Sequence, residues 1–163
     1  MSANTPFGEG QIGRAQTVGN YGFRLSRAGA LVPQTATASI YTVRGGRCAI
    51  YLVGMFTVAA NGTATNLTVT NTTTGAAIDR GATTNLSSAT AITSTAIGSS
   101  LTLANTVGGA LAIGAGAVVM QTVPHVVNIG TIDLTTSASN ATAQIKWQLF
   151  YIPLEGGAFV TLA

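Results

Sequence analysis

Few residues of this sequence could carry acid–base, nucleophilic or metal chemistry. A Ser–His–acid triad would need His125, the single histidine, to lie between a serine and an acid such as Asp133. The G-x-S-x-G turn that presents such a serine in many hydrolases is missing. Since His125 follows Pro124 and precedes Val126, we interpret it as a neutral histidine near a strand end. The single cysteine, Cys48, lies in an apolar run, and we expect a buried, unreactive thiol.

Motifs for metals and cofactors are weak. A histidine-based metal site would need carboxylates at ligand spacing, but the four acids are scattered along the chain: Glu9, Asp79, Asp133 and Glu155. The segment GEGQIG matches the dinucleotide-binding glycine pattern at Gly8, Gly10 and Gly13. That motif binds a dinucleotide only where it follows a strand and opens a helix. Only seven residues precede this copy, so we interpret the match as a coincidence. We therefore expect no metal, no cofactor and no enzymatic activity.

The composition indicates a β-rich protein whose surface carries little charge. Ala, Thr, Gly and Ser make up 82 of the 163 residues, whereas Lys, Arg, Asp and Glu together number 11. Soluble domains are typically about 25% charged. Scarce charge and abundant β-branched residues argue against disorder, and the near absence of Lys and Glu argues against a helical bundle. Because so bare a surface is unusual for a free monomer, we expect that partner chains, including copies of this chain, cover part of it.

The few charges also bear on nucleic-acid and membrane partners. Five of the seven basic residues lie in the first 47 positions: Arg14, Arg24, Arg27, Arg44 and Arg47. Scattered arginines without a lysine cluster are a weak footprint for nucleic acid, so we expect no nucleic-acid partner. Residues 101–120 are uncharged and long enough to cross a bilayer, but their glycines and the lack of flanking cations favour two short strands joined by a glycine turn. We expect no membrane partner, and the N-terminus does not resemble a signal peptide.

Residues 1–34 differ from the rest of the chain. They are rich in glycine and show no sustained apolar period, yet they carry large apolar side chains that a free linker would not need. We predict an extended N-terminal arm over residues 1–34 that becomes ordered against a partner.

From residue 35 onward the pattern is typical of short strands. Segment 143–154 places four large side chains on one face, with Lys146 and Gln148 on the other: Ile145, Trp147, Leu149 and Tyr151. Asn61-Gly62 is the strongest local hairpin signal. We predict an all-β domain over residues 35–163, a β-sandwich of jelly-roll form. The expected strands are 37–43, 48–58, 65–71, 131–136, 143–154 and 159–162, with weaker ones at 76–78, 89–97, 100–104, 109–113 and 117–123.

The C-terminal fifth of the chain resembles the ends of small tailed-bacteriophage virion proteins. The resemblance is carried by residues 130–163, in which a strand with Lys146, Trp147 and Tyr151 is followed by Pro153-Leu154, a Gly156-Gly157 turn and a short final strand. Proteins of that family are capsid decoration, cement or head-stabilising proteins. The resemblance implies a non-enzymatic β-sandwich, usually a homotrimer, on the exterior of the virion's icosahedral capsid, where it bridges subunits of the major capsid protein.

A protein that binds only the assembled lattice stabilises it by mass action, and contacts with several subunits add avidity. We expect the arm to supply these contacts, since arginine pairs bidentately with carboxylates. The candidate partner-binding residues are the aromatics and arginines of the arm: Phe7, Arg14, Tyr21, Phe23, Arg24 and Arg27.

Two other classes remain open. A receptor- or glycan-binding fibre or spike module would need an exposed aromatic or polar pocket in loops such as 71–100. A β-protein that forms the shell itself would assemble without any partner, although this chain is short for that role.

Overall fold

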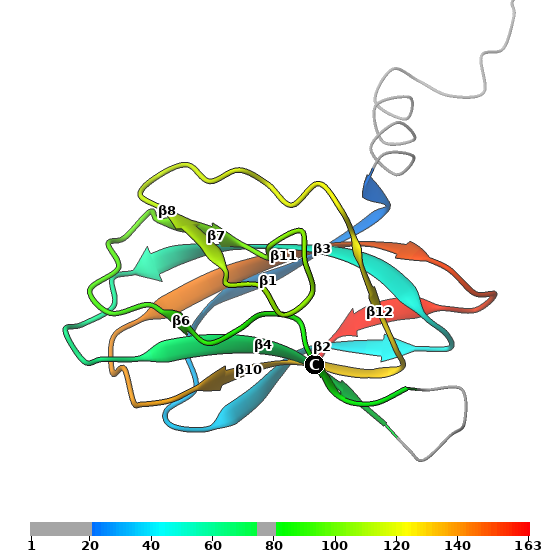
Figure 1. The fold of residues 1–163 in the computed structure, drawn as a ribbon, viewed down its shortest axis with the longest axis horizontal. Coiled ribbons are helices and arrows are strands. Elements are labelled where there is room, and N and C mark those ends of the chain that lie inside the picture. Colours follow the sequence, from blue (N-terminus) through cyan, green and yellow to red (C-terminus); the bar gives the residue numbers. More distant parts are fainter. Residues whose placement is uncertain (1–20, 75–80) are drawn as a thin grey trace, which may run out of the picture.

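The protein is built from two antiparallel β-sheets of six strands each (Figure 1). The structure is a computed structural model and describes residues 21–74 and 81–163. Sheet A contains β1 (Phe23–Leu31), β3 (Cys48–Val58), β7 (Ser100–Thr102), β8 (Ala112–Gly114), β9 (His125–Val127) and β11 (Gln144–Pro153). Sheet B contains β2 (Thr37–Arg44), β4 (Asn66–Thr73), β5 (Thr84–Asn85), β6 (Thr90–Ala91), β10 (Gly130–Thr136) and β12 (Phe159–Leu162). The predicted all-β sandwich is confirmed.

The chain passes repeatedly from one sheet to the other. Sheet A has the order β1-β11-β3-β7-β8, with β9 also paired to β3, and sheet B has the order β12-β2-β10-β4-β5, with β6 also paired to β4. From β1 to β4 each strand lies in the opposite sheet from the one before it. The hairpin prediction at Asn61-Gly62 is therefore wrong, because β3 and β4 lie in different sheets. The Asn61 side chain instead accepts a hydrogen bond from the Thr63 backbone and forms a local turn within the crossover.

The core lies between the sheets and follows the alternation of the strands. In β11, Ile145, Trp147, Leu149 and Tyr151 are buried, as their spacing predicted. Trp147 lies opposite Gly54 of β3, where an added Cβ would be 2.9 Å from the Trp147 ring and 2.8 Å from Leu101. Glycine at position 54 therefore makes room for the largest side chain of the core.

Several predicted segments differ from the structure. Segment 117–123 was predicted as a strand but contains none, and β9 was not predicted at all. Within 101–120, β7 and β8 pair antiparallel, as expected for two short strands joined by a turn. No helix among the described residues is long and apolar enough to cross a membrane. The predicted strand at 76–78 lies outside the described residues.

The boundary of the predicted arm needs correction. Residues 23–31, which we placed in the arm, form β1 and pair antiparallel with β11. Most of this strand is exposed, because it lies at the edge of sheet A. An edge strand exposed in this way lacks the alternation of apolar and polar residues from which a strand is predicted. Residues 1–20 of the predicted arm lie outside the described residues.

A buried glutamine completes the hydrogen bonding of β3. One edge of this strand pairs with β9 over Cys48–Ile50 and with β7 over Val53–Met55, which leaves a gap between them. Gln121, only 3% exposed, fills that gap. Its Nε2 donates to the Ile50 carbonyl at 3.4 Å, and its Oε1 accepts from the Leu52 backbone at 3.4 Å. The side-chain amide thus takes the place of a peptide group of a neighbouring strand.

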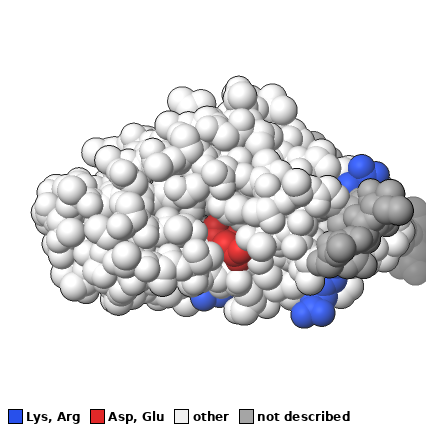
Figure 2. Space-filling view, turned by 60° about the horizontal axis from the view of Figure 1, so that its bottom comes forward, with Lys and Arg blue, Asp and Glu red and all other residues white. Residues whose placement is uncertain are grey.

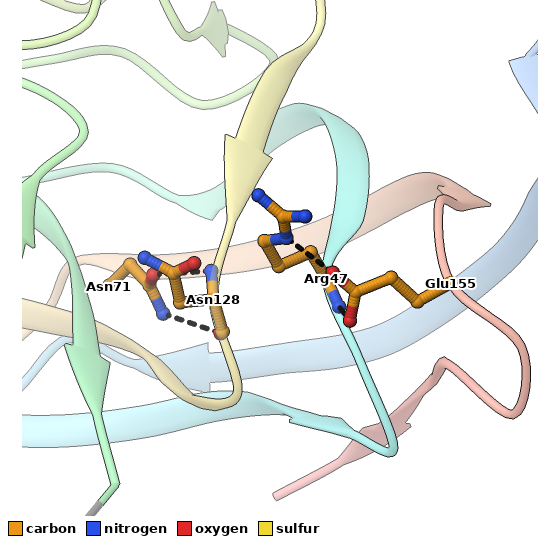
Figure 3. A network of polar contacts seen from close by, with 4 residues as sticks. All are labelled: Arg47, Asn71, Asn128 and Glu155. Carbon is orange, nitrogen blue, oxygen red and sulfur yellow. Dashed lines mark hydrogen bonds and ion pairs between the residues drawn. The ribbon is translucent and has the colours of Figure 1, made fainter. Parts of the chain in front are cut away.

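Two further polar contacts fix loops to the sandwich (Figure 3). Asn71 of β4 donates from Nδ2 to the Asn128 and Thr131 carbonyls at 3.2 Å each, and its Oδ1 accepts from the Asn128 backbone at 2.9 Å. Arg47 forms an ion pair with Glu155, whose carboxylate also accepts from the Arg47 backbone at 3.1 Å. Because the ion pair is exposed, it adds little to stability, whereas the buried amide of Asn71 satisfies groups that water cannot reach.

Replacement of Gln121 should destabilise the fold. The Gln121→Met substitution keeps the length of the side chain but leaves a buried N–H and a buried carbonyl of β3 without partners. We expect a loss of about 1–3 kcal/mol in the free energy of unfolding, measured by urea denaturation. Thr122→Val, at the adjacent exposed position, is the control and should be near neutral. Equal effects of the two substitutions would contradict the role given to the Gln121 amide.

Candidate partner-binding surface

The residues considered for catalysis are not brought together. His125 is buried on β9 of sheet A, whereas Asp133 lies on β10 of sheet B. Cys48 is buried as predicted, and burial raises the pKa of its thiol to about 11, which keeps it protonated at neutral pH. Within residues 21–74 and 81–163, no three His, Cys, Asp or Glu side chains are grouped so that they could hold a metal ion.

The described candidate partner-binding residues gather at the start of β1. Phe7 and Arg14 lie outside the described residues. The Tyr21 ring packs edge-on against Tyr51 of β3, with centroids 5.8 Å apart, and against Phe150 of β11 at 6.0 Å. Tyr21 nevertheless remains 42% exposed. Its ring therefore extends an aromatic cluster from the outer face of sheet A toward solvent.

Gly22 allows the chain to turn between this cluster and β1. Its φ is +78°, and a Cβ at this position would be 2.0 Å from the Tyr151 carbonyl oxygen. A side chain is therefore excluded both by the backbone conformation and by the contact with β11. Beyond the turn, Phe23 packs on Tyr151 with ring centroids 5.3 Å apart and stays 49% exposed. The two aromatic residues of this part of the arm are thus both fixed against β11 and both accessible.

The two arginines of β1 have different environments. Arg24 is exposed, lies opposite Phe150, and forms no hydrogen bond or ion pair with a described residue. Arg27 lies opposite the inward-facing Trp147, and its Nη1 donates to the Ile40 carbonyl at 3.3 Å and the Ala163 carbonyl at 3.2 Å. Arg27 therefore joins the edge of sheet A to sheet B. Arg24 is the arginine of β1 whose guanidinium is available to a partner.

A hollow continues the aromatic cluster along the outer face of sheet A. It has a volume of about 230 Å³ and is lined by Val53, Gly54, Met55, Ser100, Lys146 and Gln148. The register places Phe150, Gln148 and Lys146 of β11 beside Tyr51, Val53 and Met55 of β3, respectively. Since alternate residues of a strand face the same side, these six side chains lie together on the outer side of sheet A, where Tyr51 is only 8% exposed and the other five are half-buried. We call Tyr21, Arg24 and these six residues the sheet A stripe.

The sequence pattern contained part of this stripe. Lys146 and Gln148 were predicted to face away from the core. Tyr51, Val53 and Met55 belong to segment 48–58, whose residues are apolar on both faces and which therefore predicts a central strand buried on both sides. The strand is central, and its first five residues are buried, but Val53 and Met55 are half-buried. Such a strand does not reveal which of its residues face outward. The stripe combines aromatic, aliphatic and cationic groups without an acid, and it therefore suits a protein surface that presents carboxylates.

The buried His125 predicts how stability depends on pH. Burial lowers the pKa of its imidazole below the ordinary 6.5, and polar backbone atoms of Ala104 and Asn105 offset part of the shift. Neither ring nitrogen makes a hydrogen bond of normal geometry. Because the unfolded chain binds a proton more readily than the folded one, stability should fall as the pH drops below about 6.5. Thermal melts should show a lower melting temperature at pH 5.5 than at pH 7.5 in the wild type, and a smaller difference in His125→Gln. Equal differences in the two proteins would contradict the role given to His125.

No family model matches this chain, and no match to it was found among curated proteins or solved structures.

Proposed function

We propose that this chain is a non-enzymatic structural protein of a tailed-bacteriophage virion. In this proposal it binds the outside of the assembled icosahedral capsid, bridges subunits of the major capsid protein, and needs no cofactor. The observation that carries the proposal is the sheet A stripe, a partly exposed surface of aromatic, aliphatic and cationic side chains on a molecule that otherwise has little charge. The resemblance of residues 130–163 to capsid decoration proteins supports the same assignment.

The connections between strands support a jelly-roll fold, in which a long two-stranded ribbon wraps into two sheets. The chain contains four successive antiparallel pairs of such a ribbon, β1 with β11, β2 with β10, β3 with β9 and β4 with β5. In this interpretation β7 and β8 are an insertion, and β12 is an added edge strand beside β2. Jelly rolls are common in viral capsid proteins, but the fold also occurs in lectins, and so it supports a virion protein without requiring one.

The sheet A stripe offers a mechanism for attachment. Tyr and Arg side chains supply a large share of binding energy at protein interfaces, and Tyr21 and Arg24 are the accessible examples at the start of β1. A protein that binds only the assembled shell stabilises it by about 2.7 kcal/mol per site at a free concentration 100 times its Kd. Copies that contact several capsid subunits at once bind more tightly through avidity, which increases this stabilisation of the shell. The resemblance implies that these copies form a trimer.

Binding to phage heads tests the proposal. Heads that lack the protein should sediment with the purified chain, whereas the same heads dissociated into subunits should bind it at least tenfold more weakly. The double variant Tyr21→Ser/Arg24→Gln should reduce occupancy of assembled heads at least tenfold, since it removes both accessible anchors. Val119→Ser, at a position that is 83% exposed in another loop, is the matched control and should bind normally.

Two results would contradict the proposal. Equal binding to assembled and dissociated heads would remove the lattice-specific mechanism. Failure to bind heads, together with binding to surface glycans of the host, would favour the receptor- or glycan-binding module.

A further inference from the structure

Two cations on the outer side of sheet A have no partner within the described part of the chain. Lys146 of β11, the single lysine of the sequence, and Arg24 of β1 form no hydrogen bond or ion pair with a described residue. The acids among the described residues lie elsewhere, Asp133 in sheet B and Glu155 in the loop after β11. The outer side of sheet A is therefore positive and supplies no acid of its own.

Charged groups are also sparse on the opposite side of the molecule. Figure 2, in which the sheet B side comes forward, shows a few separate charged spots on an otherwise uncharged surface. Two unpaired cations on one side of one sheet are therefore a distinctive feature of this chain.

Lys146 lines the hollow on sheet A together with a second unpartnered polar group. The amide of Gln148 also makes no hydrogen bond with another described residue, and both side chains are half-buried. Each has lost part of its water without gaining a partner, which costs free energy unless a ligand supplies one. Val53, Met55 and the backbone of Gly54 provide an apolar lining beside these two groups.

The hollow has the size and chemistry to receive an acidic side chain. A cavity of about 150 Å³ holds a benzene molecule, so a hollow of about 230 Å³ has room for a glutamate side chain. Its methylene groups would contact Val53 and Met55. Its carboxylate would accept charge-assisted hydrogen bonds from Lys146 Nζ and a further bond from Gln148 Nε2.

The register sets the distance between the two cations. Lys146 and Phe150 lie four residues apart on β11, which is about 13 Å along the strand, and Arg24 is paired with Phe150. An extended segment that lies along β11 has the same rise per residue, so its residues i and i+4 span the same distance. Residue i+2 of that segment faces the same side and lies between the two cations.

We propose that the sheet A stripe binds an extended segment of its partner in which two acidic residues are separated by three others, the middle one apolar. One carboxylate enters the hollow and pairs with Lys146, and the other pairs with Arg24. The apolar side chain between them packs on Val53 and Phe150. The pattern, acid-x-apolar-x-acid, is the same in both chain directions, so the segment can run either way along β11.

This inference rests on the proposed function, in which the partner is the major capsid protein, and it names the chemistry that the shell must present. A protein segment suits the stripe better than a small free anion does. A small anion would pair with only one of the two cations, and it would leave the exposed ring of Tyr21 and the neighbouring Phe150 uncovered.

An NMR titration of the full chain with synthetic peptides tests the inference. The probe is a peptide with the core Glu-Ser-Leu-Ser-Glu, blocked at both ends so that its only charges are the two carboxylates. We expect chemical-shift changes confined to the sheet A stripe and to the residues lining the hollow. A peptide with glutamine at both acidic positions should bind at least about tenfold more weakly, because it loses both charge-assisted hydrogen bonds. A Glu-Ser-Leu-Glu-Ser core directs its second carboxylate to the opposite side of the segment and should also bind more weakly.

Variants of the chain locate the site. Lys146→Gln should weaken binding of the probe about tenfold, whereas Lys146→Arg keeps the charge and should restore most of it. Arg44→Gln is the matched control, since it removes an exposed and unpaired cation from β2 of sheet B and should bind like the wild type. Equal thermal melts of these variants would show that each one is folded.

Three results would overturn the inference: no shift at millimolar probe concentrations, equal binding of the glutamate and glutamine peptides, or unchanged binding by Lys146→Gln. Phage heads separate it from the proposed function. Heads that bind the wild type and Lys146→Gln equally would overturn the inference and leave the proposed function standing. A probe that binds the stripe while heads do not would support the segment chemistry and contradict the proposed function.

Discussion

The pairing of β3 with β11 is the interaction on which the rest of the structure depends. Ten residue pairs join the two strands at the centre of sheet A. On the inner side this ladder places Trp147 against Gly54 and Leu149 beside Leu52, which forms the middle of the core. On the outer side the same ladder aligns the residues of the sheet A stripe. One register therefore sets both the packing of the core and the candidate binding surface. A shift by one residue would turn the outward-facing side chains into the core and the core side chains outward.

A chain with so few charges satisfies its buried polar groups mainly with neutral side chains. Gln121 completes the edge of β3, and Asn71 holds the turn before β10. The ion pair between Arg47 and Glu155 lies at the surface, where water weakens it. The two outer faces consequently differ in chemistry. Sheet A carries aromatic rings and cations on its outer side, whereas the outer side of sheet B carries mainly hydroxyls, with Asp133 buried among them and Arg44 exposed at the end of β2.

The long strands could be predicted from the sequence, and several shorter features could not. Alternation in 143–154 and 131–136 predicted both the strands and their buried faces. It failed for β1, because an edge strand exposed along most of its length has no apolar period, and for β9, because three residues after a proline are too few to show one. Gln121 is a polar residue within an apolar run. Its hydrogen bonds to β3 could not be predicted, because they depend on the gap that β7 and β9 leave along the edge of that strand. The alignment of Thr161, Thr42, Thr131 and Thr72 across sheet B follows only from the register of four strands, although the alternating threonines of β4 are visible in the sequence.

We propose, as the central claim, that the sheet A stripe attaches the protein to an assembled capsid. The most direct measurement is a cryo-electron microscopy reconstruction of phage heads incubated with the purified chain. The account predicts added density on the outside of the shell, placed over the junctions between major capsid subunits, with the sheet A stripe against the shell. A bare shell, or density confined to the tail or its fibres, would contradict it.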